Sequence, residues 1–170
     1  MGSPRDIRRL ALMALYQLDA RSGADVELIR SSLDDTDTFL SEGLSFADPS
    51  SKLSEKDRDR AFESAVGAYG NIEVADAEFN GLSTEWAVHR MPAIDRAILR
   101  LAHYEMTMIA DPKPKASVNE AIELAKQFST AESPGFVNGL LDKVLRRVLR
   151  ESDQQSDQQS GQAAAESAEL

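Results

Sequence analysis

The segment from Lys115 to Val148 contains two helix-start signals, and each precedes a run of residues with helical periodicity. Ser117 and Glu120 have the spacing of a capping box, in which the serine hydroxyl accepts an N–H of the first turn and the glutamate bonds back to the serine N–H. Ser133 followed by Pro134 is a second signal, because proline is favoured at the first helical position. The sequence therefore predicts one helix from Ser117 to about Phe128 and another that begins at Ser133.

Helical periodicity also dominates the rest of the chain, and no segment alternates apolar and polar residues for long enough to predict a strand. Ser22 and Gly23 are expected to end the first helix. Asp25 is expected to cap the second helix, and Ser54 with Asp57 the third. We therefore predict an all-α fold with about six to seven helices. The expected ranges are residues 5–20, 25–33, 54–79, 92–109, 117–128 and 133–149.

The last twenty residues differ in composition from the rest of the chain. After Glu151 the sequence reads SDQQSDQQSGQ, without an apolar residue, and then continues with Ala and Glu. A segment of this composition cannot bury enough apolar surface to offset the entropy lost on folding. We therefore expect residues 1–150 to form the folded part and residues 151–170 to form a disordered acidic tail rich in Ser, Gln and Ala.

The net charge of −10 would ordinarily argue against nucleic-acid binding, because phosphate contacts depend on Lys and Arg. Half of this charge lies in the tail, which carries five acidic residues and no Lys or Arg. At the other end, Arg5, Arg8 and Arg9 form a dense positive cluster opposed only by Asp6. The cluster could be a flexible arm that follows a phosphate backbone or a solvated helix face, and the residues alone do not decide between the two.

Residues suited to catalysis or metal binding are sparse. The chain has no cysteine, no glycine-rich phosphate loop and no hydrolase or zinc-protease motif. His89 and His103 have no carboxylates at ligand spacing and are interpreted as an exposed or half-buried pair without function. Glu105 falls on an apolar stripe, where a structural contact to backbone or to a base is favoured over acid catalysis. We therefore predict that the protein is not an enzyme and needs no metal or cofactor.

Four segments of the chain match motifs of a known family, and the last two of them occur in order and at the family's spacing. They are RRLALMALY at residues 8–16, DRAILRLA at 95–102, NEAIELAK at 119–126 and FVNGLLDK at 136–143. In these motifs the chain resembles the NusB family of bacterial transcription antitermination factors. The resemblance implies a NusB-like fold of two small helical bundles packed across each other, here at about residues 4–80 and 83–150.

The resemblance also implies a function. NusB-like proteins bind the boxA element of nascent ribosomal RNA transcripts together with NusE, a protein of the small ribosomal subunit, so that RNA polymerase ignores terminators. The expected partners are therefore boxA-type single-stranded RNA, NusE and the transcription elongation complex, with no membrane involved. Self-association as a homodimer stays open.

The resemblance assigns two sets of site residues. Phe136 by itself favours a core position, but the matching phenylalanine of the family lies at the RNA surface, where bases stack on aromatic rings. Tyr16 and Asp95 match positions that face NusE, although the helical pattern alone would make both of them ordinary surface residues. The residues implied in RNA binding are Arg5, Arg8, Arg9, Lys113, Lys115, Glu132 and Phe136.

Two other function classes fit parts of the pattern. A helical protein-interaction module with little or no RNA affinity would suit the short arginine cluster and the acidic tail. An RNA-binding module of a cytosine methyltransferase would share the fold, but the chain is too short to add a methyltransferase domain. The apolar run from Leu10 to Tyr16 is too short to span a bilayer and there is no signal-peptide pattern, so a soluble cytoplasmic protein is expected.

Overall fold

The computed structural model describes residues 2–35 and 53–168, and within these ranges every regular element is a helix. The all-α prediction is therefore confirmed for the described part of the chain. The elements in chain order are α1 (Pro4–Ala20), α2 (Val26–Ser32), α4 (Glu55–Gly70), α5 (Ile72–Leu82), the short 3-10 helix η1 (Val88–Arg90), α6 (Ala93–Thr107), α7 (Pro114–Phe128) and α8 (Ser133–Ala168).

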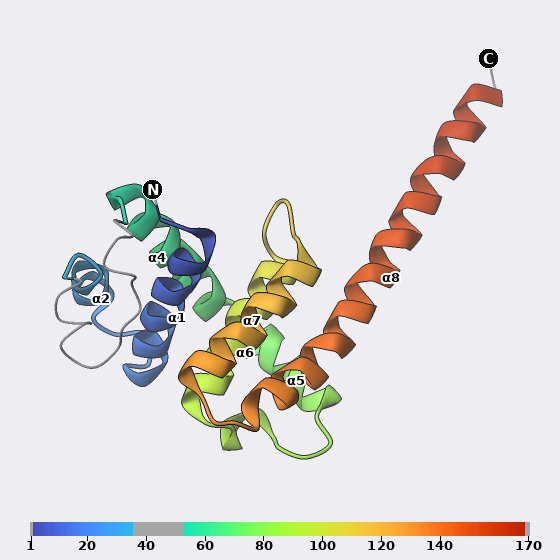
Figure 1. Ribbon diagram of the computed structural model, residues 1–170. Helices are drawn as coiled ribbons and strands as arrows, with labels where there is room; N and C mark the ends of the chain where they lie inside the picture. The colour runs from blue at the N-terminus through green and yellow to red at the C-terminus, as the bar shows by residue number, and fades with distance from the viewer. Residues whose placement is uncertain (1, 36–52, 169–170) are drawn as a thin grey trace.

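Helix α6 lies at the centre, in contact with α1 and α4 on one side and with α5, α7 and α8 on the other (Figure 1). Helix α1 packs against α4, and α7 packs against α8. The central position of α6 follows from its sequence, since apolar residues occupy most of its circumference. The boundary between two bundles near residue 80 stays a prediction, because α5 touches α4 as well as α6 and α8.

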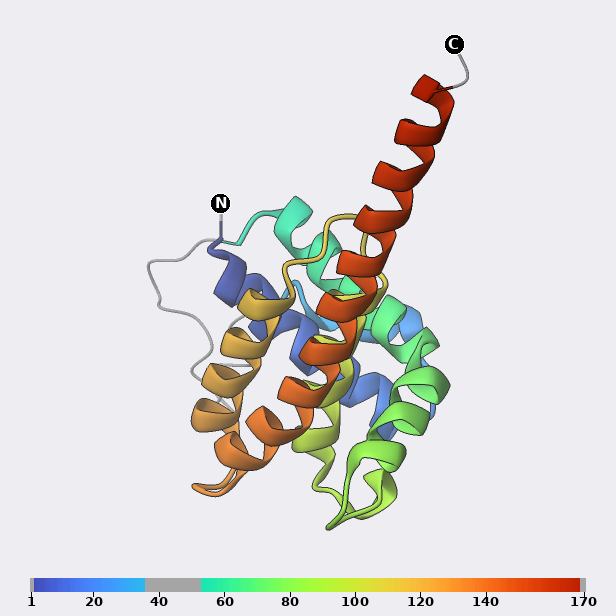
Figure 2. The same cartoon turned by 90° about the vertical axis from the view of Figure 1, so that its right-hand side faces the viewer.

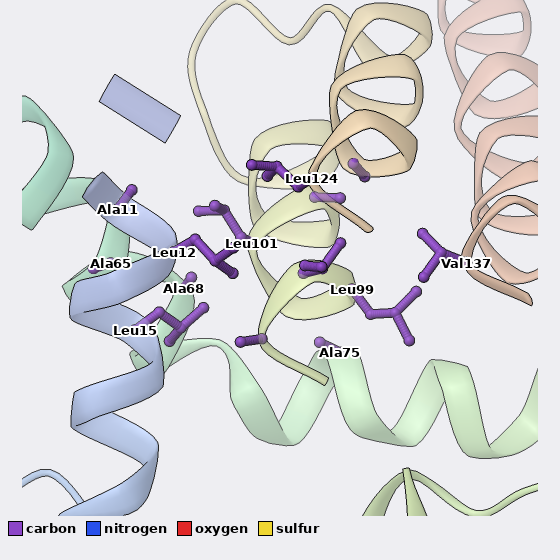
Figure 3. Close-up of a cluster of buried hydrophobic side chains, with 14 of the residues drawn as sticks. Ala11, Leu12, Leu15, Ala65, Ala68, Ala75, Leu99, Leu101, Leu124 and Val137 are labelled. Carbon is purple, nitrogen blue, oxygen red and sulfur yellow. The ribbon is translucent and has the colours of Figure 1, made fainter. Parts of the chain in front are cut away.

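The core is continuous across the helices. It joins apolar side chains of α1 and α4 to those of α6, α7 and α8 through residues such as Leu12, Leu101 and Leu124 (Figure 3). Small residues on α4 let neighbouring helices approach closely. A Cβ added at Gly67 would lie 2.3 Å from the Tyr104 ring, so this glycine is needed where α4 meets α6.

Several helix ends lie where the sequence predicts them. After α1 the chain turns through Ser22 and Gly23, whose φ angles of 51° and 78° lie in the left-handed region. Helix α4 begins behind the predicted capping box, in which Ser54 Oγ accepts the Asp57 N–H and the Asp57 carboxylate accepts the Ser54 N–H. Helix α8 begins at Ser133, as expected.

Two predicted caps are wrong. Ser117 lies inside α7, because the helix begins one turn earlier at Pro114, and its buried hydroxyl donates to the Lys113 carbonyl. Proline at the first position is itself a start signal, and it takes precedence over the serine. Asp25 precedes α2 but has φ 57° and makes no side-chain cap bond. Its carboxylate instead accepts from Arg21 Nη1 at 2.7 Å.

The single helix predicted for residues 54–79 is two helices, α4 and α5, separated at Asn71.

The buried Asn71 amide lies 3.0 Å from Nδ1 of His103, and Nε2 of the same ring lies 2.7 Å from Glu78. The interpretation of His103 as exposed or half-buried is therefore wrong, since only 1% of it is exposed. Buried polar groups require hydrogen-bond partners, and α4 and α5 supply them here. His89 is exposed.

The segment predicted to be a disordered tail is instead helical in the structure. Helix α8 continues to Ala168 and extends beyond the other helices (Figure 2). Residues 151–162 are exposed, so packing does not hold them. The helix can continue because residues 133–150 already form a packed nucleus, and each added residue then needs no new nucleation. In this part of the helix a serine hydroxyl donates to the backbone carbonyl one turn earlier, as Ser156 Oγ does to the Ser152 carbonyl.

Candidate nucleic-acid interface

The arginine cluster lies on an ordered helix rather than on a flexible arm. Helix α1 begins at Pro4 behind a capping box, in which Ser3 Oγ accepts the Asp6 N–H and the Asp6 carboxylate accepts the Ser3 N–H. The sequence analysis missed this box. It fixes Arg5 within the first turn of the helix. Of the two alternatives left open by the sequence, the structure therefore has the helix face and not the flexible arm.

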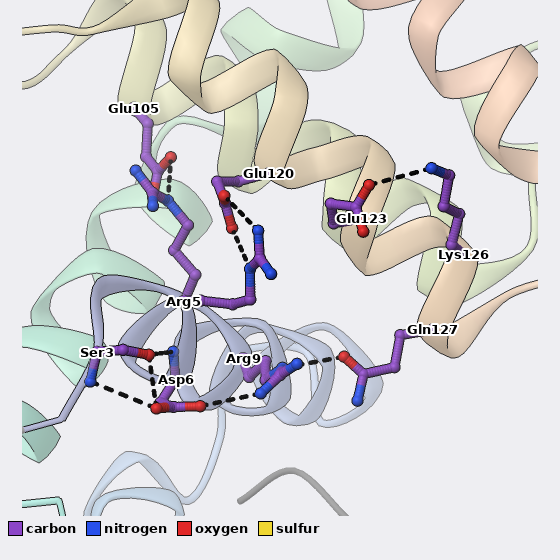
Figure 4. Close-up of polar contacts among 10 residues, drawn as sticks. Ser3, Arg5, Asp6, Arg9, Glu105, Glu120, Glu123, Lys126 and Gln127 are labelled. Carbon is purple, nitrogen blue, oxygen red and sulfur yellow. Dashed lines mark hydrogen bonds and ion pairs between the residues drawn. The ribbon is translucent and has the colours of Figure 1, made fainter. Parts of the chain in front are cut away.

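All three arginines have acidic or amide partners from other parts of the chain (Figure 4). Arg8 Nε donates to both carboxylate oxygens of Glu105 on α6, each at 3.0 Å. Arg9 donates from Nη1 to Asp6 at 2.9 Å and from Nε to the Gln127 amide oxygen at 2.9 Å. The contact expected for Glu105 is thus confirmed as an ion pair with a base.

Arg5 and Glu120 form the most exposed of these pairs. Arg5 donates from Nε and Nη2 to the two oxygens of Glu120 on α7. This hydrogen bonding raises the pKa of Arg5 and lowers the pKa of Glu120, so both groups are charged at neutral pH. Because the carboxylate offsets the guanidinium charge, the cluster presents less positive potential than the sequence suggests.

Helices α1 and α7 run in the same direction, since Arg5 pairs with Glu120 and Arg9 reaches Gln127 one to two turns further along. Between them lies a half-open cavity of about 190 Å³. Its walls combine cationic, anionic and amide groups with one apolar side chain. The lining residues are Arg5, Arg9, Glu120, Glu123, Leu124, Lys126 and Gln127.

Five of these residues were not identified as site residues from the sequence, among them the polar Glu123, Lys126 and Gln127. With Glu120 they recur at spacings of three and four, which marks the outward face of α7. Such a face is ordinarily a solvated surface, and only the position of α1 makes it one wall of a cavity. The helical spacing was the signal available, but it does not say what lies opposite.

Lys113 and Lys115 are exposed at the amino-terminal end of α7. The two lysine charges repel each other and the positive end of the helix dipole, so positive potential is concentrated at this end of α7. From Lys115 to Gln127 the helix rises about 18 Å. The two lysines therefore lie at one end of α7, and the residues of α7 that face Arg5 and Arg9 of α1 lie further along the same helix, beside the cavity.

Glu132 and Phe136 lie at the opposite end of α7, at the start of α8. Glu132 is exposed, whereas Phe136 is partly buried and packs against the core. The Phe136 side chain therefore contacts the core and is also partly accessible to solvent, so both positions considered for it apply in part. The structure brings these two residues to the Gln127 end of α7 and leaves the two lysines at the other end.

The two residues assigned to a protein partner differ in exposure. Tyr16 is 39% exposed on α1, but only 3% of Asp95 is exposed. The expectation that Asp95 is a surface residue is wrong. Its carboxylate accepts hydrogen bonds from Ser129 Oγ at 2.5 Å and from Ser133 Oγ at 2.9 Å. These hydroxyls belong to the connection between α7 and α8.

Among residues 2–35 and 53–168, no three side chains of His, Asp or Glu gather closely enough to hold a metal ion. No helix in the described ranges has both the length and the apolar content to cross a membrane.

The fold and this interface define a class of all-α proteins with charged side chains along two parallel helices. The profile of the NusB family matches residues 5–146, and the chain therefore belongs to the NusB family. Transcription antitermination protein NusB of Geobacter sulfurreducens is 35% identical over 143 residues, which cover 84% of this chain and 94% of the relative. The protein of the same description from Trichlorobacter lovleyi is 38% identical over 143 residues, with 84% and 90% covered.

Solved structures share the fold. NusB of T. maritima superimposes with a TM-score of 0.64 at 29% identity, covering 86% of this chain and 93% of that chain. A structure of NusB and NusE in complex with double-stranded RNA has a TM-score of 0.64 at 19% identity, with 84% and 96% covered. The predicted NusB-like fold is confirmed.

Proposed function

We propose that this protein is a transcription antitermination factor that binds boxA RNA of nascent ribosomal transcripts together with NusE, within the elongation complex in the cytoplasm. The observation that carries the RNA-binding part is the ordered position of Arg5, Arg8 and Arg9 on α1, where Arg5 and Arg9 line the cavity beside α7 and Arg8 pairs with Glu105 on α6. Membership of the NusB family supports the biological role.

The RNA would follow α7. Phosphates would bind the arginines and, at one end, Lys113 and Lys115. At the other end a base would stack on the accessible face of Phe136. The guanidinium of Arg5 already binds an anion through two parallel N–H donors, the geometry in which arginine binds phosphate. RNA binding would therefore exchange a carboxylate for a phosphate at a side chain that is already oriented.

This exchange implies weak binding by the protein alone. Each phosphate contact gains a charge-assisted bond but breaks one with Glu105, Glu120 or Asp6. The net gain is the difference between the two bonds. NusE would add contacts that do not depend on this exchange, and Tyr16 on the exposed face of α1 is the residue proposed to meet it.

A titration of boxA RNA at two or more salt concentrations, with and without NusE, tests the proposal. If three phosphates are bound by the arginines, the logarithm of the affinity should fall with the logarithm of salt concentration with a slope of about −2, at roughly −0.7 per contact. Replacing Arg5, Arg8 and Arg9 together with Ala should remove this part of the slope and leave only the part that Lys113 and Lys115 contribute. An unchanged slope would contradict RNA binding by these residues.

A matched control removes the same charge elsewhere. Arg21 directly follows α1, and Arg60 and Arg146 lie on α4 and α8; all three are exposed, and none was assigned to RNA. Their triple replacement with Ala changes the net charge equally. It should leave the slope and the affinity close to those of the unaltered protein.

A second candidate function is a helical protein-interaction module with little RNA affinity. The observation that favours it is that each arginine of the cluster already has an intramolecular partner, in a chain with a net charge of −10. The same titration separates the two functions. The interaction module predicts binding of NusE with no preference for boxA RNA over an unrelated RNA, whether or not NusE is present.

A further inference from the structure

Asp95 is a buried carboxylate at the start of α6 whose partners come from a distant part of the chain. Its Oδ1 accepts from Ser129 Oγ, and its Oδ2 accepts from Ser133 Oγ. In the described part of the chain, the neighbouring Arg96 and Arg100 direct their ion pairs to other carboxylates. Two hydroxyls, rather than a cation, therefore stabilise the buried Asp95 side chain.

One arrangement of the protons in this cluster satisfies both oxygens of Asp95, although Ser129 Oγ also lies 2.9 Å from Ser133 Oγ. A hydroxyl carries one proton, so Ser129 and Ser133 each give theirs to one oxygen of Asp95. Thr130 Oγ1 lies 2.9 Å from Ser133 Oγ and can donate to it. Every hydroxyl proton in the cluster is then used, and both oxygens of the carboxylate are occupied. The carboxylate also lies in the first turn of α6, where a helix dipole favours negative charge.

The cluster fixes the connection between α7 and α8. Ser129 ends α7 and Ser133 begins α8, so the bonds to Asp95 hold both ends of the four-residue turn against α6. Glu132 precedes Ser133 directly, and Phe136 follows one turn later, where its N–H donates to the Glu132 carbonyl at 3.4 Å. The positions of these two side chains depend on where Ser133 is held.

We infer that Asp95 is a positioning residue that holds the turn between α7 and α8, and through it places Glu132 and Phe136 on the RNA-binding face, and that it does not contact NusE itself. The part that concerns RNA rests on the proposed function. The part that concerns the turn rests on geometry alone, and it is tested in the free protein.

The first measurement is hydrogen exchange of the backbone amides of residues 130–137. Asp95→Asn keeps the size of the side chain but removes its charge and replaces one acceptor oxygen with a donor nitrogen, so one serine hydroxyl must reorient and the charge-assisted bonds of the cluster are weakened. We expect exchange in this segment to quicken by about two- to tenfold, the factor that corresponds to one ordinary hydrogen bond. Glu73→Gln is the matched control, because Glu73 is an exposed carboxylate in the first turn of α5.

A second pair of variants distinguishes the effect of the Ser129 hydroxyl from any effect of the substitution on the backbone. Ser129 has extended φ and ψ angles of −123° and −166°, which a β-branched residue adopts readily. Ser129→Thr keeps the hydroxyl and should exchange like the unaltered protein. Ser129→Ala removes it and should quicken exchange as Asp95→Asn does, and the combined variant should show less than the sum of the two effects, because both act on the same cluster.

The second measurement compares partners. Asp95→Asn should weaken boxA RNA binding by about two- to tenfold and leave the affinity for NusE without RNA unchanged. Unaltered exchange at residues 130–137 in Asp95→Asn would overturn the inference. So would a loss of NusE affinity accompanied by normal exchange, because Asp95 would then be a partner contact. If the unaltered protein does not bind boxA RNA, the proposed function fails, while the exchange data still decide whether Asp95 holds the turn.

Discussion

Arg5 and Glu120 are 115 residues apart in sequence and form a bidentate ion pair between α1 and α7. The distances from Arg5 Nε to Glu120 Oε2 and from Arg5 Nη2 to Glu120 Oε1 are both 3.0 Å. Glu120 occupies the two donors that Arg5 would offer to a phosphate. Arg5 is half-exposed, so an RNA can reach it once the carboxylate is released. The pair therefore both orients Arg5 and competes with RNA for it.

We predict that Glu120→Gln strengthens RNA binding. The substitution removes a negative charge beside the expected phosphate path and leaves an amide that holds Arg5 less tightly. The gain should be about two- to fivefold at low salt, the factor expected for an exposed ion pair, and should shrink as salt screens the charges. Fluorescence anisotropy with a labelled boxA RNA at several salt concentrations measures it.

The control for this prediction is Glu63→Gln, which removes an exposed carboxylate from α4 and the same unit of charge. Its effect on RNA affinity should be small. A weaker affinity of Glu120→Gln would show that orientation of Arg5 outweighs the competition, and would contradict the prediction.

A second prediction concerns Arg8 and Glu105, which form a less exposed pair between α1 and α6. Arg8→Ala leaves the Glu105 carboxylate without its partner in a site where only 13% of that side chain is exposed. The free energy of unfolding should fall by about 1–3 kcal/mol, the usual cost of an unpaired buried group. Urea denaturation measures the loss.

Glu105→Gln combined with Arg8→Ala should recover most of that stability, because the unpaired charge is gone. Equal losses in the single and double variants would show that the packing of the Arg8 side chain, rather than charge pairing, is responsible. The comparison also tells how much of any RNA-binding defect of Arg8→Ala arises from instability.

These pairs show what the sequence could and could not predict. Helical periodicity, Ser54 with Asp57, and the turn at Ser22 and Gly23 are local signals, and they gave the right elements. The partners of Arg5 and Arg8 come from helices about a hundred residues away. Spacing within one helix cannot show which face of another helix lies opposite.

Asp95 and Glu151 illustrate the other two kinds of error. Asp95 was expected at the surface because it is charged, but two hydroxyls from a distant turn satisfy it in the interior. Residues from Glu151 onward were expected to be disordered because they cannot form a core. A helix that is already nucleated needs no core to continue, so composition alone was insufficient.

We predict that Phe136→Ala lowers both RNA affinity and stability. The accessible face of the ring would lose one stacking contact, worth about 1–3 kcal/mol of binding free energy. The buried face would lose core contacts, and because the ring is only partly buried the loss should stay below the roughly 3–5 kcal/mol of a fully buried phenylalanine. RNA titrations and thermal melts on the same variant give the two values.

Phe62 on α4 is a matched control, since it too is partly buried and packs against the core. Phe62→Ala should lower the melting temperature to a similar degree and leave RNA affinity unchanged. Equal effects of the two variants on RNA binding would mean that Phe136 acts only through stability.

A fourth prediction concerns pH. Asp57 is buried and accepts hydrogen bonds from the Gly2 N–H, the Ser54 N–H and the Ser54 hydroxyl. These bonds, that of Gly2 foremost, lower the pKa of Asp57 from 3.8 to about 2. A group with a lowered pKa in the folded state stabilises the protein above its unfolded pKa. That contribution is lost as the pH falls from about 4 toward 2.

Asp57→Asn should therefore be less stable than the unaltered protein at pH 5, and the difference should shrink as the pH approaches 2. Urea denaturation at intervals between pH 2 and 5 measures both curves. Asp111→Asn, an exposed change in the loop between α6 and α7, should follow the unaltered protein throughout. A difference between Asp57→Asn and the unaltered protein that stays constant over this range would contradict the assigned pKa.

The last prediction concerns the carboxyl-terminal part of α8. A disordered tail could fold back and place its acidic residues against Arg5, Arg8 and Arg9, and its removal would then raise RNA affinity at low salt. In the structure α8 instead leads away from α1 (Figure 1), and residues 151–162 touch no other helix closely enough to be buried. Truncation after Arg150 should therefore leave RNA affinity unchanged at both low and physiological salt. Stability should change little, because residues 151–162 are exposed and their ion pair with the rest of the described chain, Glu151 with Arg147, is a surface pair, which contributes little. Parallel titrations of the full-length and truncated proteins decide the matter, and a gain in affinity confined to low salt would show that the tail reaches the arginines after all.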